Sequence, residues 1–147
     1  MLKQIIADHQ QFSFVPGQTY KWSPVEQTIY YQPKTAVSWS LLHELAHALL
    51  GHQDYKSDIE LLKIELSAWH KARQIGENYG IIIDQDHIEN CLDTYRDWLK
   101  TRATCPECKT VTTQTAANHY LCYSCSAQWS VPSSPLCRVV RIKKTLA

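Results

Sequence analysis

Apolar residues recur at helical spacing in four parts of this chain. The patterns cover residues 1–10, about 36–51, 57 or 58 to 76, and about 86–102. Residues three and four apart share one face of an α-helix, so each pattern predicts a helix with an apolar side. Gly51 is placed to end the second helix, Ser57 or Asp58 to cap the third, and Asp86 with Glu89 to form a capping box on the fourth.

Between the first two helices, short runs of aromatic and β-branched residues predict strands. Residues 20–22 and 28–31 are two such runs, and Ser23-Pro24 separates them, so we expect a small hairpin. Pro24 confines the first strand to a short edge piece. A weak alternation over residues 136–144 predicts one further strand near the C-terminus.

One charged residue interrupts the apolar face of the third helix. At 100° per residue, Glu65 falls near the centre of a stripe that is otherwise formed by Leu61, Ala68, Trp69, Ala72 and Ile75. A carboxylate is costly to bury unless it has a strong partner. The position of Glu65 therefore predicts such a partner on a neighbouring element.

The second helix carries the sequence His43-Glu44-Leu45-Ala46-His47. Histidines four residues apart lie on one helix face, where both imidazoles can bind one Zn²⁺. A glutamate after the first histidine can take a proton from a zinc-bound water, whose pKa the metal lowers toward about 7. We expect a catalytic zinc bound by His43 and His47, with Glu44 as the catalytic residue.

Such a zinc needs a third protein ligand and one open position. Glu65 is the best candidate, because zinc ligation would explain its place on the buried face. His52 lies five residues past His47, beyond Gly51, and His70 falls on the polar face, so neither is expected to be a ligand. The alternative is a helix pair whose ordinary histidines form a salt bridge with a buried glutamate.

A second metal site is predicted from two C-x-x-C sequences separated by 13 residues. Four thiolates at this spacing can hold one Zn²⁺ in a closed tetrahedral site, as in a zinc ribbon. The ligands are Cys105, Cys108, Cys122 and Cys125. A redox pair is the alternative, but no βαβ pattern accompanies it. Cys91 is expected to be a buried small hydrophobe, and Cys137 to be free.

The balance of charged residues changes close to the position where the paired cysteines begin. Residues 1–99 hold 8 Lys or Arg against 13 Asp or Glu, whereas residues 100–147 hold 7 against 1. We therefore predict two domains, residues 1–103 and residues 104–147, the second ending in a basic tail. Arg138, Arg141, Lys143 and Lys144 could bind nucleic acid, although a structural role or docking of a protein substrate explains them equally well.

The composition is that of a globular protein. The chain has 147 residues, of which 44% are hydrophobic and 20% charged, so disorder is not expected. No apolar run approaches the roughly 18 residues of a membrane span, and the N-terminus has no long apolar segment of a signal peptide. We expect a cytoplasmic protein that is not bound to a membrane.

The motif HELAHALLGH at residues 43–52, followed by Glu65-Leu66-Ser67-Ala68-Trp69, resembles the ImmA/IrrE zinc metallopeptidases. In that family the HExxH histidines and a glutamate of a following E-x-x-A sequence bind zinc, which implies the roles given above for His43, His47, Glu65 and Glu44. The family cuts helix-turn-helix repressors, which implies a protein substrate of that kind. The edge strand beside a zincin site pairs with the substrate, and residues Thr28, Ile29, Tyr30 and Tyr31 are the expected strand.

We therefore expect an α+β fold: a small zincin-like metallopeptidase domain of three to four helices with a short β-sheet, then a four-cysteine zinc ribbon. The expected function is that of a site-specific, regulatory zinc endopeptidase with two zinc ions, one catalytic and one structural. Two alternatives remain. One is a SprT-like protease acting on DNA–protein crosslinks, although the His-Gly pair of that family is missing here. The other is a non-catalytic module that binds nucleic acid or a protein partner.

Overall fold

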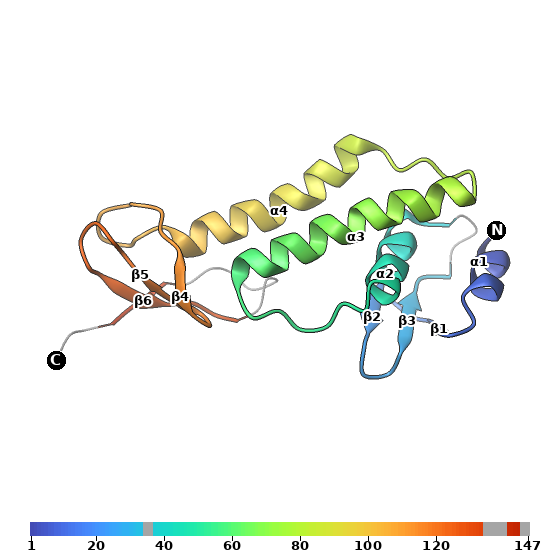
Figure 1. The fold of residues 1–147 in the computed structure, drawn as a ribbon, viewed down its shortest axis with the longest axis horizontal. Helices are drawn as coiled ribbons and strands as arrows, with labels where there is room; N and C mark the ends of the chain where they lie inside the picture. Colours follow the sequence, from blue (N-terminus) through green and yellow to red (C-terminus); the bar gives the residue numbers. More distant parts are fainter. Residues whose placement is uncertain (34–36, 134–140, 145–147) are drawn as a thin grey trace. The chain divides into compact units, whose positions relative to one another are not determined.

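The structure is a computed structural model that describes residues 1–33, 37–133 and 141–144. Over these residues it is a mixed α+β protein with four helices and two small sheets (Figure 1). By internal packing it divides into two compact units, residues 1–54 with 64–88 and residues 55–63 with 89–147. The predicted boundary after residue 103 stays a prediction.

The sheet of the first unit has three strands: β1 (Ser13–Pro16), β2 (Lys21–Ser23) and β3 (Thr28–Tyr31). The predicted hairpin is confirmed, because β2 pairs antiparallel with β3. The strand β1 was not predicted, and it pairs parallel with the other side of β3. The strand order is therefore β1-β3-β2, and the prediction that residues 28–31 form an edge strand is wrong.

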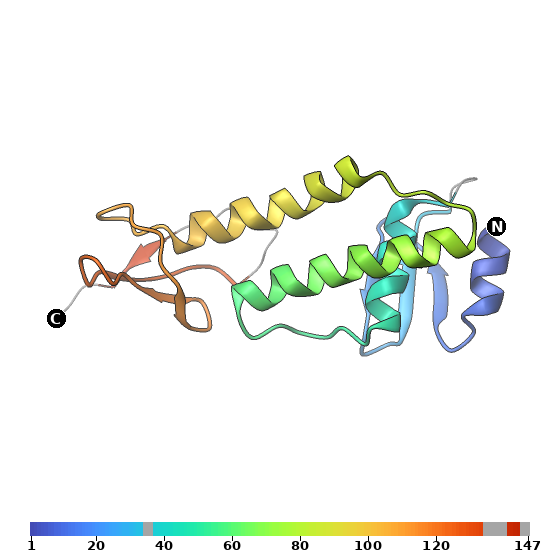
Figure 2. The same ribbon diagram turned by 45° about the horizontal axis from the view of Figure 1, so that its top comes forward.

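Helix α1 (Leu2–Asp8) precedes this sheet, and helix α2 (Trp39–Leu49) packs against β2 and β3 (Figure 2). The Ser38 side chain caps α2 by accepting a hydrogen bond from the amide of Ser40. Gly51 has φ +65°, the left-handed conformation that ends helices and that glycine adopts without strain, so the predicted helix end is confirmed. Leu41, Leu42, Leu45 and Ala46 are all buried on α2.

Helix α3 (Asp58–Asn78) runs two residues further than expected. Gly76 lies inside it because the chain returns closely at this point: a Cβ on Gly76 would lie 2.5 Å from the carbonyl oxygen of Ile81. The predicted buried stripe is confirmed, with Leu61, Glu65, Ala68, Trp69, Ala72 and Ile75 all buried. Helix α4 (Gln85–Ala103) starts one residue before the predicted cap, since Asp84 and not Asp86 accepts the capping hydrogen bond, from the amide of Asp86.

The second unit contains an antiparallel sheet of four short strands. They are β4 (Gln114–Ala116), β5 (His119–Leu121), β6 (Gln128–Ser130) and β7 (Ile142–Lys143), in that order across the sheet. Part of the strand predicted at 136–144 is thus present as β7, and residues 134–140, with Arg138 and Cys137, lie outside the described residues. Tyr120 stacks on Trp129, with 5.5 Å between the ring centroids, and both residues are buried in the second unit.

A buried ion pair joins the first turn of α3 to the last turn of α4, and hydrogen bonds connect the pair to the segment that carries the four-stranded sheet. Arg102 donates to Asp58 from Nε at 2.8 Å and from Nη2 at 3.2 Å, and both side chains are almost fully buried. Tyr120 also donates its hydroxyl to Asp58, while Arg102 donates to Asn118 and to the carbonyl of Pro132. All of these residues belong to the second unit, so its core includes the ends of two helices.

Candidate functional site

Helices α2 and α3 bring the three predicted ligands of the first site together. Ligand atoms of His43, His47 and Glu65 all lie within 4.8 Å of one another, and all three residues are buried. Nε2 of His43 is 3.1 Å from Oε2 of Glu65 and 3.0 Å from Nε2 of His47, and Nε2 of His47 is 3.6 Å from Oε1 of Glu65. Two imidazoles and a carboxylate converge in the manner of a metal site, so the partner predicted for Glu65 is present.

The electrostatics of the cluster fit an ionised Glu65. Burial raises the pKa of this carboxyl group, but hydrogen bonds from His43 and His47 and their charges lower it more, and the resulting pKa is about 2. The carboxylate is therefore ready to bind a cation at neutral pH. This donor set is one that zinc accepts, with three protein ligands leaving room for a fourth.

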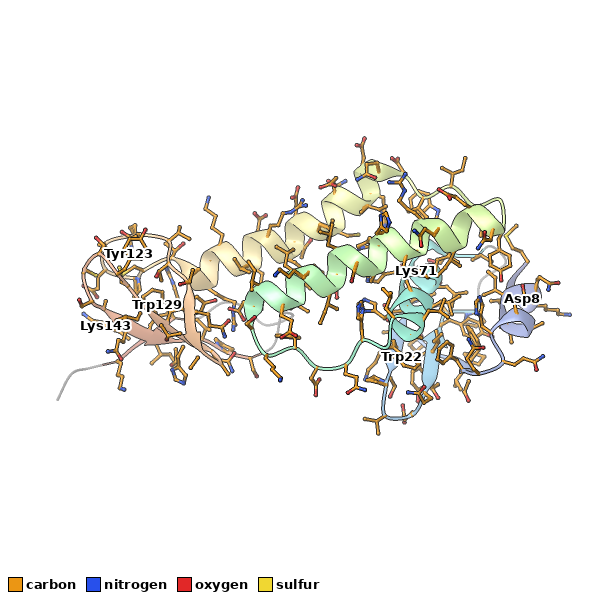
Figure 3. The ribbon with its side chains drawn as sticks, viewed as in Figure 1. Asp8, Trp22, Lys71, Tyr123, Trp129 and Lys143 are labelled. Carbon is orange, nitrogen blue, oxygen red and sulfur yellow. The ribbon has the colours of Figure 1, made fainter. Side chains whose placement is uncertain are left out.

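The catalytic candidate Glu44 is held by the neighbouring strand. The backbone amide of Trp22 donates a 2.7 Å hydrogen bond to Oε2 of Glu44, and the Trp22 indole Nε1 donates at 3.0 Å to the carbonyl of His52. Trp22 lies where β2 meets α2 (Figure 3). Trp22 could not be identified from the sequence, because its partners Glu44 and His52 lie 22 and 30 positions further along the chain.

His52 does not belong to the ligand cluster, as expected, but it contacts a ligand. Its Nδ1 is 2.9 Å from Nδ1 of His47, and its Nε2 is 3.3 Å from Oγ of Ser67. Burial lowers the pKa of His52, and the nearby His47 lowers it further. Ser67 is half-buried on α3, and its hydroxyl donates to the carbonyl of Ile64 at 2.9 Å.

His43 is oriented by an aromatic ring. Its imidazole stacks on Trp69, with 4.2 Å between ring centroids and an interplanar angle of 27°. Trp69 meets His87 edge-on at 5.4 Å, and His87 lies against Trp39 at 4.8 Å. Nδ1 of His43 is buried, and the described residues offer it no hydrogen-bond partner. The two ligand histidines are thus supported differently, one by stacking and one by a hydrogen bond.

Other residues considered from the sequence lie elsewhere. His70 is exposed, as expected for the polar face of α3. Tyr79 donates to Asp8 of α1 at 2.8 Å, and burial together with that bond raises its pKa to about 12. Tyr55 donates to the carbonyl of Ser133 in the second unit. Neither tyrosine is engaged with the His43 cluster by these bonds.

The four cysteines of the second predicted site also form one cluster. Sulfur atoms of Cys105, Cys108, Cys122 and Cys125 lie within 4.8 Å of one another, and the described cysteines are all free of disulfides. Hydrogen bonding to Thr110 lowers the pKa of Cys108 to about 6, which favours the thiolate form that binds metal. The cluster is therefore a second candidate metal site, and it could form a zinc ribbon.

Both cysteine pairs sit in the same type of turn. In each, the amide of the first cysteine donates to the carbonyl five residues later, and the amide four residues later donates back to the first cysteine's carbonyl. The residue after the second cysteine, Lys109 or Ser126, has a positive φ of 64° or 61°. Such a turn points both sulfurs of a pair to the same side, and two related turns complete the four-sulfur cluster.

Two of the four basic residues predicted at the C-terminal edge are used within the unit. Arg141 donates to the carbonyl of Thr104 at 2.7 Å, and Lys143 forms a 2.8 Å ion pair with Glu107. Cys91 is partly buried on α4. None of the helices in the described ranges is long and apolar enough to cross a membrane. The cytoplasmic location stays a prediction.

Comparisons with protein families, with curated proteins and with solved structures give no match for this chain. What the protein does must therefore be argued from the two candidate metal sites and the groups around them.

Proposed function

We propose that this protein is a zinc-dependent endopeptidase of the kind that the ImmA/IrrE resemblance implies. The observation that carries the proposal is the cluster of His43, His47 and Glu65, with Glu44 next to the first histidine on the same helix. Two histidines and a carboxylate form the ligand set of catalytic zinc in several peptidases. When bound there, Zn²⁺ would acidify a coordinated water and polarise the carbonyl of the scissile bond.

The residues of the chain supply the remaining parts of the reaction. Glu44 is the proposed general base, which takes a proton from the attacking water and returns it to the leaving amine. The amide of Trp22 engages Oε2 of Glu44, so we assign the proton to the other oxygen, Oε1. Glu65 and the two histidines would bind the metal, while Trp69 stacks on His43 and His52 contacts His47.

The substrate is proposed to be a protein such as a helix-turn-helix repressor, on the basis of the resemblance alone. Because residues 28–31 are paired on both sides, an extended substrate cannot add to that strand. Within the residues that the structure describes, β2 is an edge strand near Glu44, and its Trp22 amide faces away from β3 and donates to Glu44. We therefore move the proposed substrate strand from β3 to β2.

The four-cysteine site is proposed to hold a structural zinc. A closed set of four thiolates stabilises a small fold without leaving a position for substrate. The contacts of Arg141 and Lys143 with their own unit support this structural role over nucleic-acid binding. The non-catalytic reading remains an alternative, which zinc content and cleavage together separate from the peptidase reading. The SprT-like reading also remains an alternative, and the missing His-Gly pair argues against it.

The test has two measurements on purified protein. Zinc per chain is first measured after gentle chelator dialysis for wild type and Glu65→Ala, with an expected fall from two ions to one. Wild type, Glu44→Gln and the control Glu77→Gln are then incubated with a proteome-derived peptide library, and new termini are identified by mass spectrometry. Glu77 is an exposed residue on α3.

We expect cleavage by wild type and Glu77→Gln, no cleavage by Glu44→Gln, and the same zinc content in all three. One zinc in wild type and in Glu65→Ala would leave only the ribbon metallated and would overturn the peptidase proposal. Cleavage by Glu44→Gln at the wild-type rate would overturn the assigned mechanism. Two zinc ions without any cleavage would favour the non-catalytic binding module.

A further inference from the structure

We propose that His52 is a positioning residue that fixes the tautomer of His47, so that His47 presents Nε2 to the metal. The inference rests on the proposed metal binding by His43, His47 and Glu65. It adds a residue outside the ligand cluster that would decide which nitrogen of a ligand histidine carries a proton. Metal-binding histidines often depend on such a hydrogen bond to the nitrogen that faces away from the ion.

The backbone of His52 is held in place on two sides. Gly51, with its positive φ, turns the chain back over the last turn of α2, and the amide of His52 donates to the carbonyl of His47 at 3.0 Å. The carbonyl of His52 accepts the 3.0 Å hydrogen bond from the Trp22 indole. These two bonds fix the main chain of His52, and its ring contacts His47 through Nδ1 and Ser67 through Nε2.

The protons of the His47–His52 contact can be assigned from chemistry. Nε2 of His47 faces His43 and Glu65, so as a metal ligand it carries no proton, and a neutral His47 then has its proton on Nδ1. Two ring nitrogens 2.9 Å apart form a hydrogen bond only if one is protonated and the other is not. Nδ1 of His52 is accordingly the acceptor.

The protons of His52 and Ser67 can then be assigned along the hydrogen bonds that lead from His47 to Ile64. A neutral His52 with a bare Nδ1 carries its proton on Nε2, which donates to Oγ of Ser67. The Ser67 hydroxyl in turn donates to the carbonyl of Ile64 in the preceding turn of α3. Every donor in the chain from His47 to Ile64 has an acceptor, and the chain ends on a carbonyl that cannot donate.

His43 supplies the contrast within the same site. Its Nδ1 has no hydrogen-bond partner among the described residues, and its ring is oriented by stacking on Trp69. Stacking fixes the plane of a ring but not its tautomer. Among the described residues, only one of the two histidine ligands has a hydrogen bond to the ring nitrogen that faces away from the cluster. That ligand is His47, and its partner His52 selects the tautomer.

Two substitutions of His52 separate acceptor chemistry from simple loss of a side chain. In His52→Asn, the amide oxygen can take the place of Nδ1 and still accept from His47. In His52→Gln, the longer side chain places its amide nearer the position of Nε2, so contact with Ser67 is kept and the acceptor for His47 is lost. Ser67→Ala removes the next acceptor in the chain.

The measurement is the zinc dissociation constant of the His43 site, obtained by chelator competition on the full chain, with the ribbon zinc as an internal reference for folding. We expect His52→Gln to weaken zinc binding about 10- to 100-fold, Ser67→Ala to weaken it less, and His52→Asn to keep most of the affinity. In the zinc-loaded wild type, ¹⁵N NMR of the His47 ring should show a proton on Nδ1 and the metal on Nε2.

Equal affinity in wild type and His52→Gln would overturn the inference while leaving the peptidase proposal intact. Equal losses in the Asn and Gln variants would overturn it too, because the acceptor would not be what matters. A metal on Nδ1 of His47 would have the same effect. If wild type binds zinc only at the ribbon, both the inference and the proposed function fail.

Discussion

The backbone amide of Trp22 and the Oε2 of Glu44 are joined by a hydrogen bond of 2.7 Å. The donor is a main-chain group of β2, so the position of the carboxylate depends on the strand and not on the identity of the side chain at residue 22. The Trp22 side chain has its own task, since its indole donates to the carbonyl of His52. One residue of the sheet thus supports both the proposed base and the turn after α2.

Replacing Trp22 with Phe should remove the second of these bonds and leave the first. A buried hydrogen bond contributes about 0.5–1.5 kcal/mol, so the free energy of unfolding should fall by that amount beyond the loss of ring volume. Trp98→Phe is the matched control: Trp22 is 9% and Trp98 is 8% exposed, but Nε1 of Trp98 has no partner among the described residues. Urea denaturation of the two variants, compared with wild type, measures the difference. A larger loss in Trp98→Phe would contradict the role given to the indole.

In the protein without metal at the His43 site, acid should weaken the contribution of Glu65 to the free energy of unfolding. The folded pKa of about 2 lies below the ordinary value of 4.5, so the ionised carboxylate stabilises the fold above pH 4.5. This stabilisation, up to about 3 kcal/mol, is lost as the pH falls from 4.5 toward 2. The quantity to measure is the difference in unfolding free energy between wild type and Glu65→Gln, without metal at the His43 site, at several pH values.

The difference in unfolding free energy between wild type and Glu65→Gln should shrink as the pH falls. Any acid sensitivity of the four-cysteine site is common to both proteins and cancels in this difference. Glu77→Gln removes an exposed carboxylate from the same helix and serves as the control. A difference that stays constant between pH 6 and pH 3 would show that the histidines do not stabilise the ionised Glu65.

Removing Asp58 should be far more damaging than removing a partner of a surface pair. Asp58→Ala leaves the Arg102 guanidinium buried without its carboxylate, a change that typically costs 3–5 kcal/mol, so about that loss is expected. Arg96→Ala breaks the exposed pairs with Glu89 and Asp93 and should cost no more than about 1 kcal/mol. Urea denaturation monitored together with retention of the ribbon zinc tests both. Similar losses in the two variants would mean that the buried pair contributes little.

The turn that contains Cys122 and Cys125 predicts opposite effects of two substitutions at Ser126. Its φ of 61° is strained for a residue with a Cβ and unstrained for glycine. Ser126→Gly should therefore stabilise the zinc-loaded ribbon by up to about 1 kcal/mol, whereas the β-branched Ser126→Val should destabilise it by about 1–2 kcal/mol. Thermal unfolding of the zinc-loaded protein gives both values. A stabilised valine variant would be inconsistent with the turn.

The metal-binding candidates could be predicted from the sequence because each depends on local spacing. The i, i+4 histidines of α2 and the two C-x-x-C pairs are fixed by helix and turn geometry, and Glu65 stood out because it interrupted an apolar stripe. Contacts across the chain were not predictable in this way. Trp22, Ser67 and Trp69 support the site through contacts that their own neighbours in sequence do not reveal.

The sheet shows the same limit. The β2–β3 hairpin follows from a short turn, but β1 pairs with β3 in parallel, and a parallel partner cannot be recognised from the residues next to it. A hairpin alone has two edge strands, and only β1 makes the strand at residues 28–31 central. Three of its four residues are buried, so both faces of this strand are covered, as is usual for a central strand.

The buried Asp58–Arg102 pair bears on how this protein can be cut or recombined. A fragment starting at residue 104 would keep all four ribbon cysteines but lose the carboxylate that binds Tyr120 and the main-chain carbonyl of Arg102 that accepts from Trp129. It would therefore carry a tyrosine and a tryptophan with orphaned donors in its core. Grafting the cysteine-bearing segment onto another protein would succeed only if residues 55–63 and 89–103 travelled with it, so the transferable piece is discontinuous along the gene.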